Sequence, residues 1–261
     1  MQPLSKQAIY VVFLREIKRY WRAKARVVSS VVQSVFLLII FGLGLGRFLG
    51  GFNGIEYLSY MAPGIIGMGL LFGSISSGVS VIFDRQFGFM KEMLVAPVSR
   101  TSIIIGKIIG GTATATIQGI ILMTVSAILG ASPLSLGFLA NAVAAIGVMM
   151  LISAGFVGLG VAIGSVLTDF RAFQVFSTFI TQPMFMLSGV FFSIDVAPFP
   201  LQVAMLADPM FYASELLRWS ILGTGSSILG PTGWLICLAV VVGFNSLMVI
   251  FGTYMFSRAQ V

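Results

Sequence analysis

Residues 137–167 read GFLANAVAAIGVMMLISAGFVGLGVAIGSVL and contain no charged side chain. An apolar run of this length is more than enough to cross the ~30 Å hydrocarbon layer of a bilayer as a helix. Similar runs recur along the 261-residue chain, in which 58% of the residues are hydrophobic and 9% are charged, whereas a soluble domain has roughly 25% charged residues. The runs lack the alternation of membrane β-strands, so the sequence predicts an all-α integral membrane protein.

We predict six transmembrane helices, at about residues 27–49, 57–83, 102–129, 137–167, 172–192 and 231–257. With the N-terminus in the cytoplasm, only Arg47 and Arg218 of the fifteen lysines and arginines fall on the outer side. Such a bias towards the inner face is the usual sign of orientation. We therefore expect a single multi-pass domain over residues 1–261, in the cell (inner, cytoplasmic) membrane, with both termini in the cytoplasm.

The net charge of +7 follows from this topology and from contact with anionic lipid head groups. The basic residues are scattered among the membrane flanks, so nucleic-acid binding is a poor explanation of the charge.

Residues 1–26 are expected to include an amphipathic helix that lies at the inner membrane interface. On a helical wheel one arc holds Ile9, Phe13, Leu14, Ile17, Tyr20 and Trp21, and the opposite arc holds Arg15, Lys18, Arg19 and Arg22. Basic residues opposite aromatic and aliphatic ones are typical of interfacial helices. A solvated basic tail is the alternative.

Residues 193–230 contain apolar segments that are too short to cross the membrane, together with three prolines and four charged residues. Segments of this length re-enter a membrane part-way or lie at its surface. We predict two short re-entrant helices, at about 199–207 and 210–222, that dip in from the outside. Glu215 and Arg218 are three residues apart and can pair on one face of the second helix. An ordinary folded outer loop is the alternative.

The residue types that catalysis or ion relay would need are nearly absent. There is no histidine, and the single cysteine, Cys237, excludes an internal disulfide. No acid lies near the middle of a predicted span, where an ion pathway would need one. Gly106-Lys107 is followed by Ile108 and therefore fails the phosphate-binding-loop pattern. The sequence thus predicts no catalytic residue, no metal site and no nucleotide site on this chain.

Small and polar residues recur inside the spans. Glycine pairs four residues apart, at 42/46, 69/73, 106/110 and 160/164, would let helix backbones approach closely. Hydroxyl and amide groups cluster in three spans: Ser74, Ser76, Ser77 and Ser80; Thr112, Thr114, Thr116 and Gln118; Ser177, Thr178, Thr181 and Gln182. Such groups either hydrogen-bond between helices or line a transport path, and the sequence leaves both uses open.

The predicted topology places the loop at residues 84–100 in the cytoplasm. Its sequence is DRQFGFMKEMLVAPVSR, in which apolar side chains surround Lys91 and Glu92, and Pro97 ends a short helix. Exposed apolar residues rimmed by charge indicate a partner site. Because the chain has neither a nucleotide site nor an ion relay, a transporter of this kind would need an external motor that pushes on such a helix.

Two motifs make the chain resemble the membrane subunit of type 2 ABC exporters, a family of short permeases that includes bacterial daunorubicin and polysaccharide exporters. The family's cytoplasmic loop runs roughly E-x-L-L-V-A-P-V-S-R, and residues 92–100 here read EMLVAPVSR, followed by Gly106-Lys107. The family's outer motif, S-G-V-F-F-P followed by N-P and an acid near an arginine, is matched by SGVFF at 188–192, Asp208-Pro209 and Glu215-Leu216-Leu217-Arg218. Ser193 and Asp208 depart from the family's proline and asparagine.

This resemblance implies an ATP-driven exporter permease that moves an amphiphilic drug, a lipid or a lipid-linked glycan outward. It implies a second permease copy, expected as a homodimer, and two separate ABC ATPase subunits that hold the ATP and magnesium, so this chain is not an enzyme and carries no cofactor. The coupling helix would be formed by Phe89, Met90, Lys91, Glu92, Met93 and Leu94, with Pro97 after it. Glu215 and Arg218 would form the outer re-entrant pair.

The sequence leaves the transported substrate and its binding residues unassigned, and it leaves homodimer and heterodimer both open. An ion-coupled secondary transporter is the alternative function, although the two halves of the chain show no convincing repeat. A lipid-modifying membrane enzyme would need a convergent set of acids, bases or metal ligands, which the sequence lacks.

Overall fold

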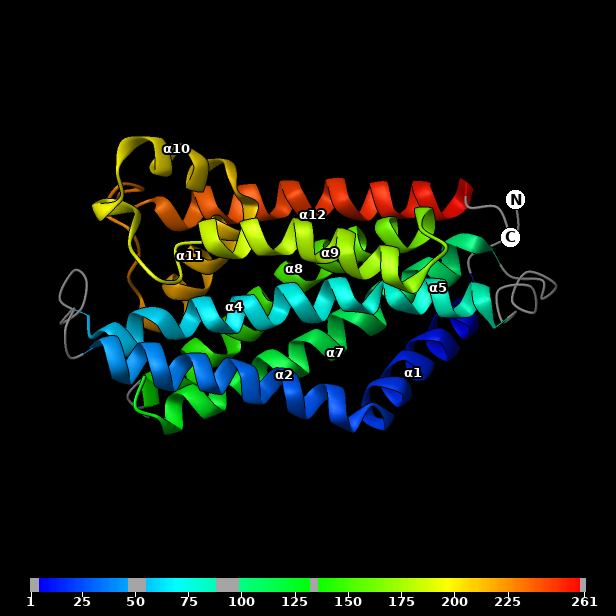
Figure 1. The fold of residues 1–261 in the computed structure, drawn as a ribbon, viewed down its shortest axis with the longest axis horizontal. Helices are drawn as coiled ribbons and strands as arrows, with labels where there is room; N and C mark the ends of the chain where they lie inside the picture. The colour runs from blue at the N-terminus through cyan, green and yellow to red at the C-terminus, as the bar shows by residue number, and fades with distance from the viewer. Residues whose placement is uncertain (1–4, 47–54, 88–98, 132–135, 259–261) are drawn as a thin grey trace.

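A computed structural model of the chain describes residues 5–46, 55–87, 99–131 and 136–258. Within these ranges the elements are α-helices, one 3-10 helix and one π-helical segment, without a β-strand. The long helices lie side by side along one axis and form an elongated bundle (Figure 1). The all-α class expected from the apolar runs is confirmed.

Four helical stretches are long and apolar enough to cross a membrane: Tyr57–Gln86, Thr101–Ile128, Asn141–Val166 and Gly233–Arg258. They correspond to helices α4 (Tyr57–Ser77) with α5 (Val79–Gln86), α7 (Arg100–Ile128), α8 (Leu136–Val166) and α12 (Gly233–Arg258). These are the predicted second, third, fourth and sixth spans.

The first and fifth predicted spans differ from simple transmembrane helices. The first consists of α2 (Lys24–Leu37) and the π-helical η1 (Leu38–Leu45), and it reaches the length and apolarity of a span only together with the preceding helix, across a bend of 66°. The fifth is α9 (Phe170–Leu187), in which Arg171, Gln174 and Gln182 lower the mean hydropathy. The described chain therefore has four spans, or five with the bent pair, and the count of six is not confirmed.

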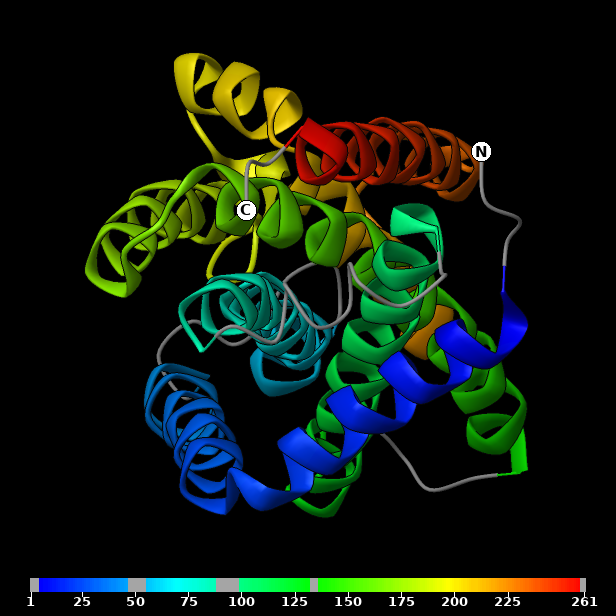
Figure 2. The ribbon, with the colours of Figure 1, turned by 90° about the vertical axis from the view of Figure 1, so that its right-hand side faces the viewer.

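The N-terminal helix α1 (Lys6–Arg22) lies across α7 at one end of the bundle (Figure 2). Its N-cap is Ser5, whose hydroxyl accepts a hydrogen bond from the Ala8 amide at 3.4 Å. Val12 and Glu16 are its buried residues, and they form a stripe that lies between the two predicted arcs of the helical wheel. The helix itself is as predicted, and its position at the membrane interface stays a prediction.

Helix α4 lies at the centre of the bundle. In the most apolar stretch of α4 and α5, 78% of the residues are buried, compared with 22% in α12. Ile65, Leu70 and Leu71 of α4 are completely buried, whereas Leu247 and Ile250 of α12 are exposed. The core therefore forms around α4, while α12 is a peripheral helix whose outer face suits contact with lipid.

Helix α8 meets the junction of α4 and α5 through glycine, as predicted from the pair at positions 160 and 164. A Cβ atom added at Gly160 would lie 2.5 Å from the carbonyl oxygen of Ile75, and one added at Gly164 would clash with the carbonyl oxygen of Gly78. Real Cβ atoms do not approach other atoms this closely. The packing role predicted for this pair is therefore confirmed.

Helix α8 is in similarly close contact with α12. A Cβ added at Gly252 of α12 would lie 2.5 Å from the carbonyl oxygen of Gly158. Nearby, the Asn245 side-chain amide donates a hydrogen bond to the Leu151 carbonyl. Backbone contacts therefore hold α8 against two neighbours, the α4–α5 junction and α12.

Two short helices follow α9 at the other end of the bundle, after the 3-10 turn η2 (Ile194–Val196). They are α10 (Phe199–Ala207) and α11 (Pro209–Leu222), which match the predicted helices at 199–207 and 210–222. Proline begins or precedes each helix, where its missing N–H costs nothing. Helix α11 packs against α4, α8 and α12, whereas α10 lies on the outside of the bundle (Figure 1). Their entry into the membrane stays a prediction.

Candidate functional site

The predicted coupling residues lie outside the described part of the chain, since Phe89, Met90, Lys91, Glu92, Met93, Leu94 and Pro97 all fall within residues 88–98. The structure does describe the two helix ends that flank this segment. Helix α5 ends at Gln86, and α7 begins at Arg100 after the N-cap Ser99, whose hydroxyl accepts from the Ser102 amide at 3.2 Å. Both ends lie at the same end of the bundle as α1 (Figure 1).

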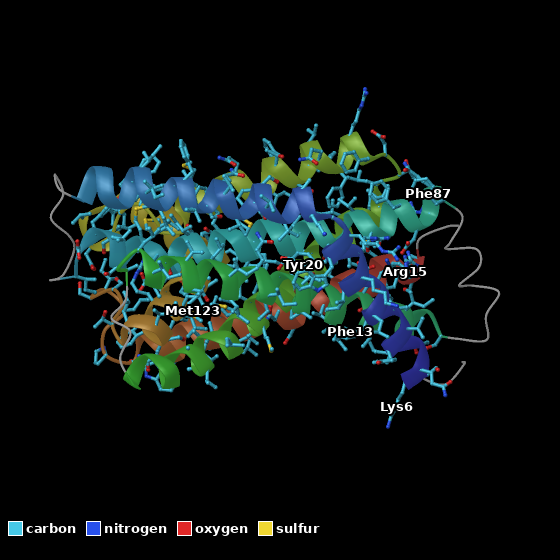
Figure 3. The ribbon with its side chains drawn as sticks, turned by 90° about the horizontal axis from the view of Figure 1, so that it is seen from below. Lys6, Phe13, Arg15, Tyr20, Phe87 and Met123 are labelled. Atoms are coloured by element: carbon cyan, nitrogen blue, oxygen red, sulfur yellow. The ribbon has the colours of Figure 1, made fainter. Side chains whose placement is uncertain are left out.

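A cluster of five charged side chains joins α1 to these two helices. We call it the inner charge cluster, after the predicted inner side of the membrane, and it consists of Arg15, Glu16, Arg19, Asp84 and Lys107. Asp84 is 1% exposed and Lys107 is 3% exposed. The Asp84 carboxylate forms ion pairs with Arg15, with Lys107 and, at 3.4 Å, with Arg19. In Figure 3, Lys6 points away from the bundle, whereas Arg15 points back towards it.

Lys107 is the centre of the cluster on the α7 side. Its ammonium group pairs with Asp84, lies 3.5 Å from a carboxylate oxygen of Glu16 and donates to the Ser80 hydroxyl at 2.9 Å. Because a buried charge without partners is very costly, these three acceptors allow a lysine to lie inside an otherwise apolar helix interface. The cluster therefore ties α1, α5 and α7 together beside the predicted coupling loop.

The start of α1 is tied to α7 a second time. The backbone amide of Ser5 donates to the Ser102 hydroxyl at 3.1 Å. Close to it, a Cβ added at Gly106 would lie 2.8 Å from Cβ of Val12, so the two helices approach at backbone distance. These contacts hold α1 directly against the end of α7 that follows residues 88–98.

Sequence patterns alone do not identify the inner charge cluster. In the sequence, Glu16, Asp84 and Lys107 are only separate residues on the predicted inner side of the membrane. One signal could have revealed the cluster. Two acids and a lysine lie close to the ends of predicted transmembrane helices, where charged side chains need partners.

Glu215 and Arg218 form an ion pair at the opposite end of the bundle, and each residue is 1% exposed. Arg218 also donates to the Gly189 carbonyl at 3.2 Å and lies over the Tyr60 ring, 3.9 Å from its centroid. Glu215 accepts a hydrogen bond from the Ser226 amide at 2.9 Å. The pair thus connects α11 with α4, with the turn after α9 and with the loop before α12.

The SGVFF motif at 188–192 forms that turn after α9. Gly189 has φ of +71°, a conformation that favours glycine, and its carbonyl accepts from the Tyr60 hydroxyl at 3.1 Å. The Phe191 carbonyl accepts from the Tyr57 hydroxyl, also at 3.1 Å. Two tyrosines of α4 therefore fix the turn on which Arg218 converges.

Ser193, where the family has proline, has a local structural role. Its hydroxyl donates to the Asp195 carboxylate at 2.9 Å and accepts from the Asp195 amide at 3.3 Å, so it caps the turn η2. The same carboxylate accepts from the Ser227 hydroxyl at 2.7 Å. The serine thus helps to hold the end of the 193–230 segment against its beginning.

Asp208, where the family has asparagine, is the N-cap of α11 and lies outside the four membrane-spanning helices. One carboxylate oxygen accepts from the Met210 amide at 3.0 Å, and the other has no partner among the described residues. Burial raises the pKa of this carboxyl from its ordinary value of 3.8 to about 7, against the opposing effect of the Met210 hydrogen bond.

Replacing Asp208 by asparagine should stabilise the protein above neutral pH. Because the folded state favours the protonated acid, stability falls as the pH rises from about 4 to about 7 and then levels off. Asparagine is an equally good N-cap and carries no charge. We expect the free energy of unfolding at pH 8 to rise by roughly 1–3 kcal/mol in Asp208→Asn, measured as thermal unfolding in detergent. The gain in the free energy of unfolding should be small at pH 4. An equal gain at pH 4 and pH 8 would contradict the raised pKa of Asp208.

Comparison with known proteins agrees with this architecture. Residues 7–222 match the family described as ABC-2 type transporter. The chain is 29% identical to the putative transport permease ycf38 of Pyropia yezoensis over 220 residues, which cover 82% of this chain and 73% of that protein. It is 26% identical to the inner membrane transport permease YadH of Escherichia coli (strain K12) over 226 residues, 85% of this chain and 86% of YadH.

Nodulation protein J of Rhizobium leguminosarum bv. viciae is similar as well, with 24% identity over 225 residues that cover 85% of each chain. The family match covers the inner charge cluster, the predicted coupling loop and the Glu215–Arg218 pair. The resemblance seen in the two sequence motifs is thereby confirmed. The chain belongs to the ABC-2 type transporter family and is a membrane permease subunit of an ABC transporter.

Proposed function

We propose that this chain is the permease of an ATP-driven exporter and that a separate ABC ATPase moves it through residues 89–97. The observation that carries this proposal is the inner charge cluster. Asp84 and Lys107 lie on the two helices that flank residues 88–98, and both are ion-paired to α1. A push on the loop would therefore reach α1, α5 and α7 together.

In this proposal ATP and magnesium are held by two ATPase subunits, and two copies of the permease form a homodimer. Closure of the ATPase pair would shift both coupling helices and change the relative population of two packings of the permease, because the ATPase binds one packing more tightly. The cargo would be an amphiphilic drug, a lipid or a lipid-linked glycan that moves outward.

The proposed topology has six crossings, with both termini in the cytoplasm of the cell membrane. The π-helical η1 would extend α2 to complete the first crossing, and α9 would form the fifth. Val175, Phe176 and Phe179 on α9 are 68%, 55% and 78% exposed, so this face suits lipid or the second permease copy. Helices α10 and α11 would then re-enter the membrane from outside, held by the Glu215–Arg218 pair.

Reversal of the charge and polarity of the coupling helix tests the proposal. The double variant Glu92→Arg/Leu94→Asp should bind the ATPase at least about thirtyfold more weakly, as expected when central interface residues are lost. ATP-driven export from vesicles should fall to background. Co-purification with candidate ABC ATPases measures the first effect, and a transport assay measures the second.

Glu56→Arg is the matched control, because Glu56 is an exposed acid at the opposite, outer end of α4. It should leave both ATPase binding and export unchanged. If binding and export survive in the double variant, the coupling assignment is wrong. If the purified permease alone moves cargo on an ion gradient, the chain is a secondary transporter instead.

A further inference from the structure

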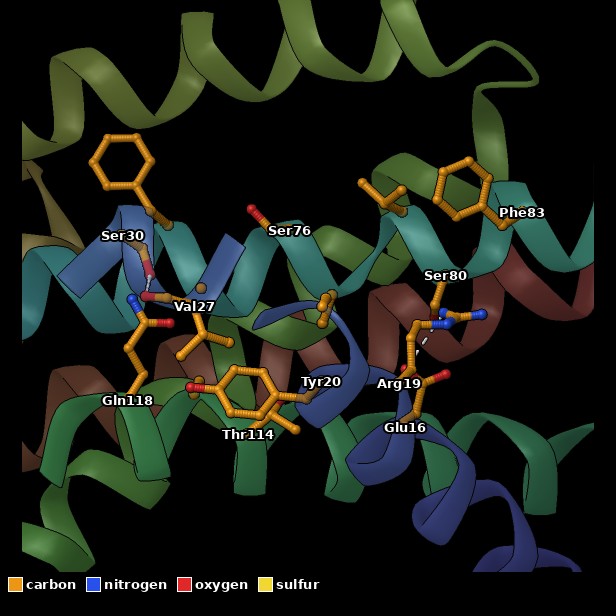
Figure 4. Close-up of a pocket in the computed structure, with 16 residues that line it drawn as sticks. Glu16, Arg19, Tyr20, Val27, Ser30, Ser76, Ser80, Phe83, Thr114 and Gln118 are labelled. Atoms are coloured by element: carbon orange, nitrogen blue, oxygen red, sulfur yellow. Dashed lines mark hydrogen bonds and ion pairs between the residues drawn. The ribbon is translucent and has the colours of Figure 1, made fainter. Parts of the chain in front are cut away.

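A cavity of about 320 Å³ lies at the bend between α1 and α2, with α4, α5 and α7 as its other walls (Figure 4). Its volume is at the lower end of the ~300–1,000 Å³ range of small-molecule sites. Part of the wall is apolar and includes Val27, Phe72 and Phe83. The rest carries hydroxyl and amide groups, so the cavity suits a molecule with both apolar and polar parts.

Gln118 of α7 is the side chain that best suits the cavity to a ligand. The residue is 5% exposed and lines the cavity, yet its side-chain amide forms no hydrogen bond with any residue in the described ranges. The hydroxyl of Tyr20 on α1 lines the same cavity and is also buried without a partner among those residues. A ligand that bonds to both groups would be favoured, because the Tyr20 hydroxyl is buried without a partner among the described residues and the Gln118 amide lines the cavity without a protein partner among them.

Three other hydroxyls of the wall, those of Ser30, Ser77 and Thr114, already donate to backbone carbonyls of their own helices. Ser30 donates to the Val27 carbonyl at 2.9 Å, Ser77 to the Ser74 carbonyl at 2.6 Å, and Thr114 to the Gly111 carbonyl at 2.9 Å. Their hydroxyl protons are therefore used within their own helices. The amide of Gln118 can both donate and accept, as can the hydroxyl of Tyr20.

The charged groups of the wall do not favour a charged ligand. Glu16 and Arg19 line the cavity, but a nitrogen of Arg19 lies 3.5 Å from a carboxylate oxygen of Glu16, and both residues belong to the inner charge cluster. A carboxylate or ammonium group in the cavity would have to displace an existing ion pair. Neutral molecules avoid this cost.

We propose that this cavity binds an uncharged amphiphile, whose hydroxyl, carbonyl or amide group bonds to Gln118 and Tyr20 while its apolar body packs against Phe72 and Phe83. The inference rests on the proposed function and narrows its cargo to neutral amphiphiles. The cavity lies where the chain bends by 66°, so a change in this angle moves its walls apart or together.

Photolabelling of the purified permease–ATPase complex tests the site. The probes are a diazirine-bearing long-chain primary amide, the matching alkane and the matching carboxylate, each with the same chain. We expect the amide to label peptides of α4 and α7 that line the cavity, and the alkane and carboxylate to label them far less. Gln118→Leu should reduce labelling by the amide about tenfold, which corresponds to the loss of about one well-formed hydrogen bond.

Gln182→Leu is the matched control, since Gln182 is an exposed glutamine on α9, outside the cavity. It should label like the wild type. Ser76→Phe fills the cavity and leaves Gln118 in place, so it should abolish labelling of the cavity. This variant keeps the test decisive if the Gln118→Leu protein does not assemble with the ATPase. Equal labelling of Gln118→Leu and the wild type, or cavity labelling by the alkane as strong as by the amide, would overturn the proposal.

Labelling of both the complex and the permease purified alone separates this inference from the proposed function. If the complex assembles and hydrolyses ATP but the amide probe does not label the cavity, the proposed binding site is wrong and the proposed ATP-driven function stands. If the amide labels the cavity but no ATPase binds the permease, the binding site stands and the cargo assignment falls with the proposed function.

Discussion

Asp84→Ala should lower the free energy of unfolding by about 3–5 kcal/mol, the usual cost of removing one partner from a buried ion pair. Asp84 is 1% exposed and is paired with Lys107, Arg15 and Arg19. Its loss leaves the buried Lys107 ammonium with Ser80 and a carboxylate oxygen of Glu16 at 3.5 Å. Thermal unfolding in detergent measures the effect, and we expect the midpoint to fall by roughly 10 °C.

Two further variants make this result specific to the buried cluster. Asp169→Ala removes an exposed aspartate that caps α9 through the Ala172 amide at 3.1 Å, and it should cost only about 1 kcal/mol. Asp84→Ala/Lys107→Met removes both buried charges, so it should be less destabilised than the sum of the two single variants. Equal, small effects of Asp84→Ala and Asp169→Ala would show that the cluster does not hold the helices together.

Arg218→Met should destabilise the opposite end of the bundle by a similar amount, about 3–5 kcal/mol. Among the described residues, the substitution leaves the buried Glu215 carboxylate with the Ser226 amide as its hydrogen-bond partner, and it removes the contacts with Gly189 and the Tyr60 ring. We expect thermal unfolding at a lower temperature and loss of export. The folded fraction should still bind the ATPase, because the helix ends that flank the proposed coupling residues lie at the other end of the bundle.

Arg218→Lys and Arg171→Met are the controls for this prediction. Lysine keeps the positive charge but lacks the planar guanidinium group that stacks on Tyr60. The stability of Arg218→Lys should therefore lie between that of the wild type and that of Arg218→Met. Arg171 is exposed at the start of α9, and its replacement should change stability by less than about 0.5 kcal/mol. Wild-type stability and export in Arg218→Met would show that the pair is unimportant.

Features that depend on local sequence could be predicted from the residues alone. Long apolar runs predict spanning helices, and the short apolar segments among the prolines of 193–230 predict the two short helices α10 and α11. The glycine pair at 160 and 164 predicts a close helix contact, which α8 makes with the junction of α4 and α5. In each case the physical signal is contained within a few turns of one helix.

Features that depend on partners far along the chain could not be predicted in this way. Glu16 and Lys107 are 91 residues apart, and Glu215 and Ser226 meet only because a loop folds back. Gln118 illustrates the limit, because its position in a polar cluster allowed either a helix contact or a place on a cavity wall. Only the packing of α1, α4 and α7 decides between these uses, by leaving its amide without a protein partner among the described residues.

The backbone contacts of α8 restrict where this permease can bend. Helix α8 meets the α4–α5 junction and α12 through glycine, so no side chain at these contacts can change its rotamer. We therefore expect these helices to keep their relative positions as one rigid unit. Ion pairs with Asp84 of α5 connect α1 to this rigid unit. Helix α2 lies beyond the bend at Ala23, with Val28, Val32 and Phe36 about 60% exposed. If this permease changes shape, the bend at Ala23 is therefore the place where α2 would move relative to the other helices.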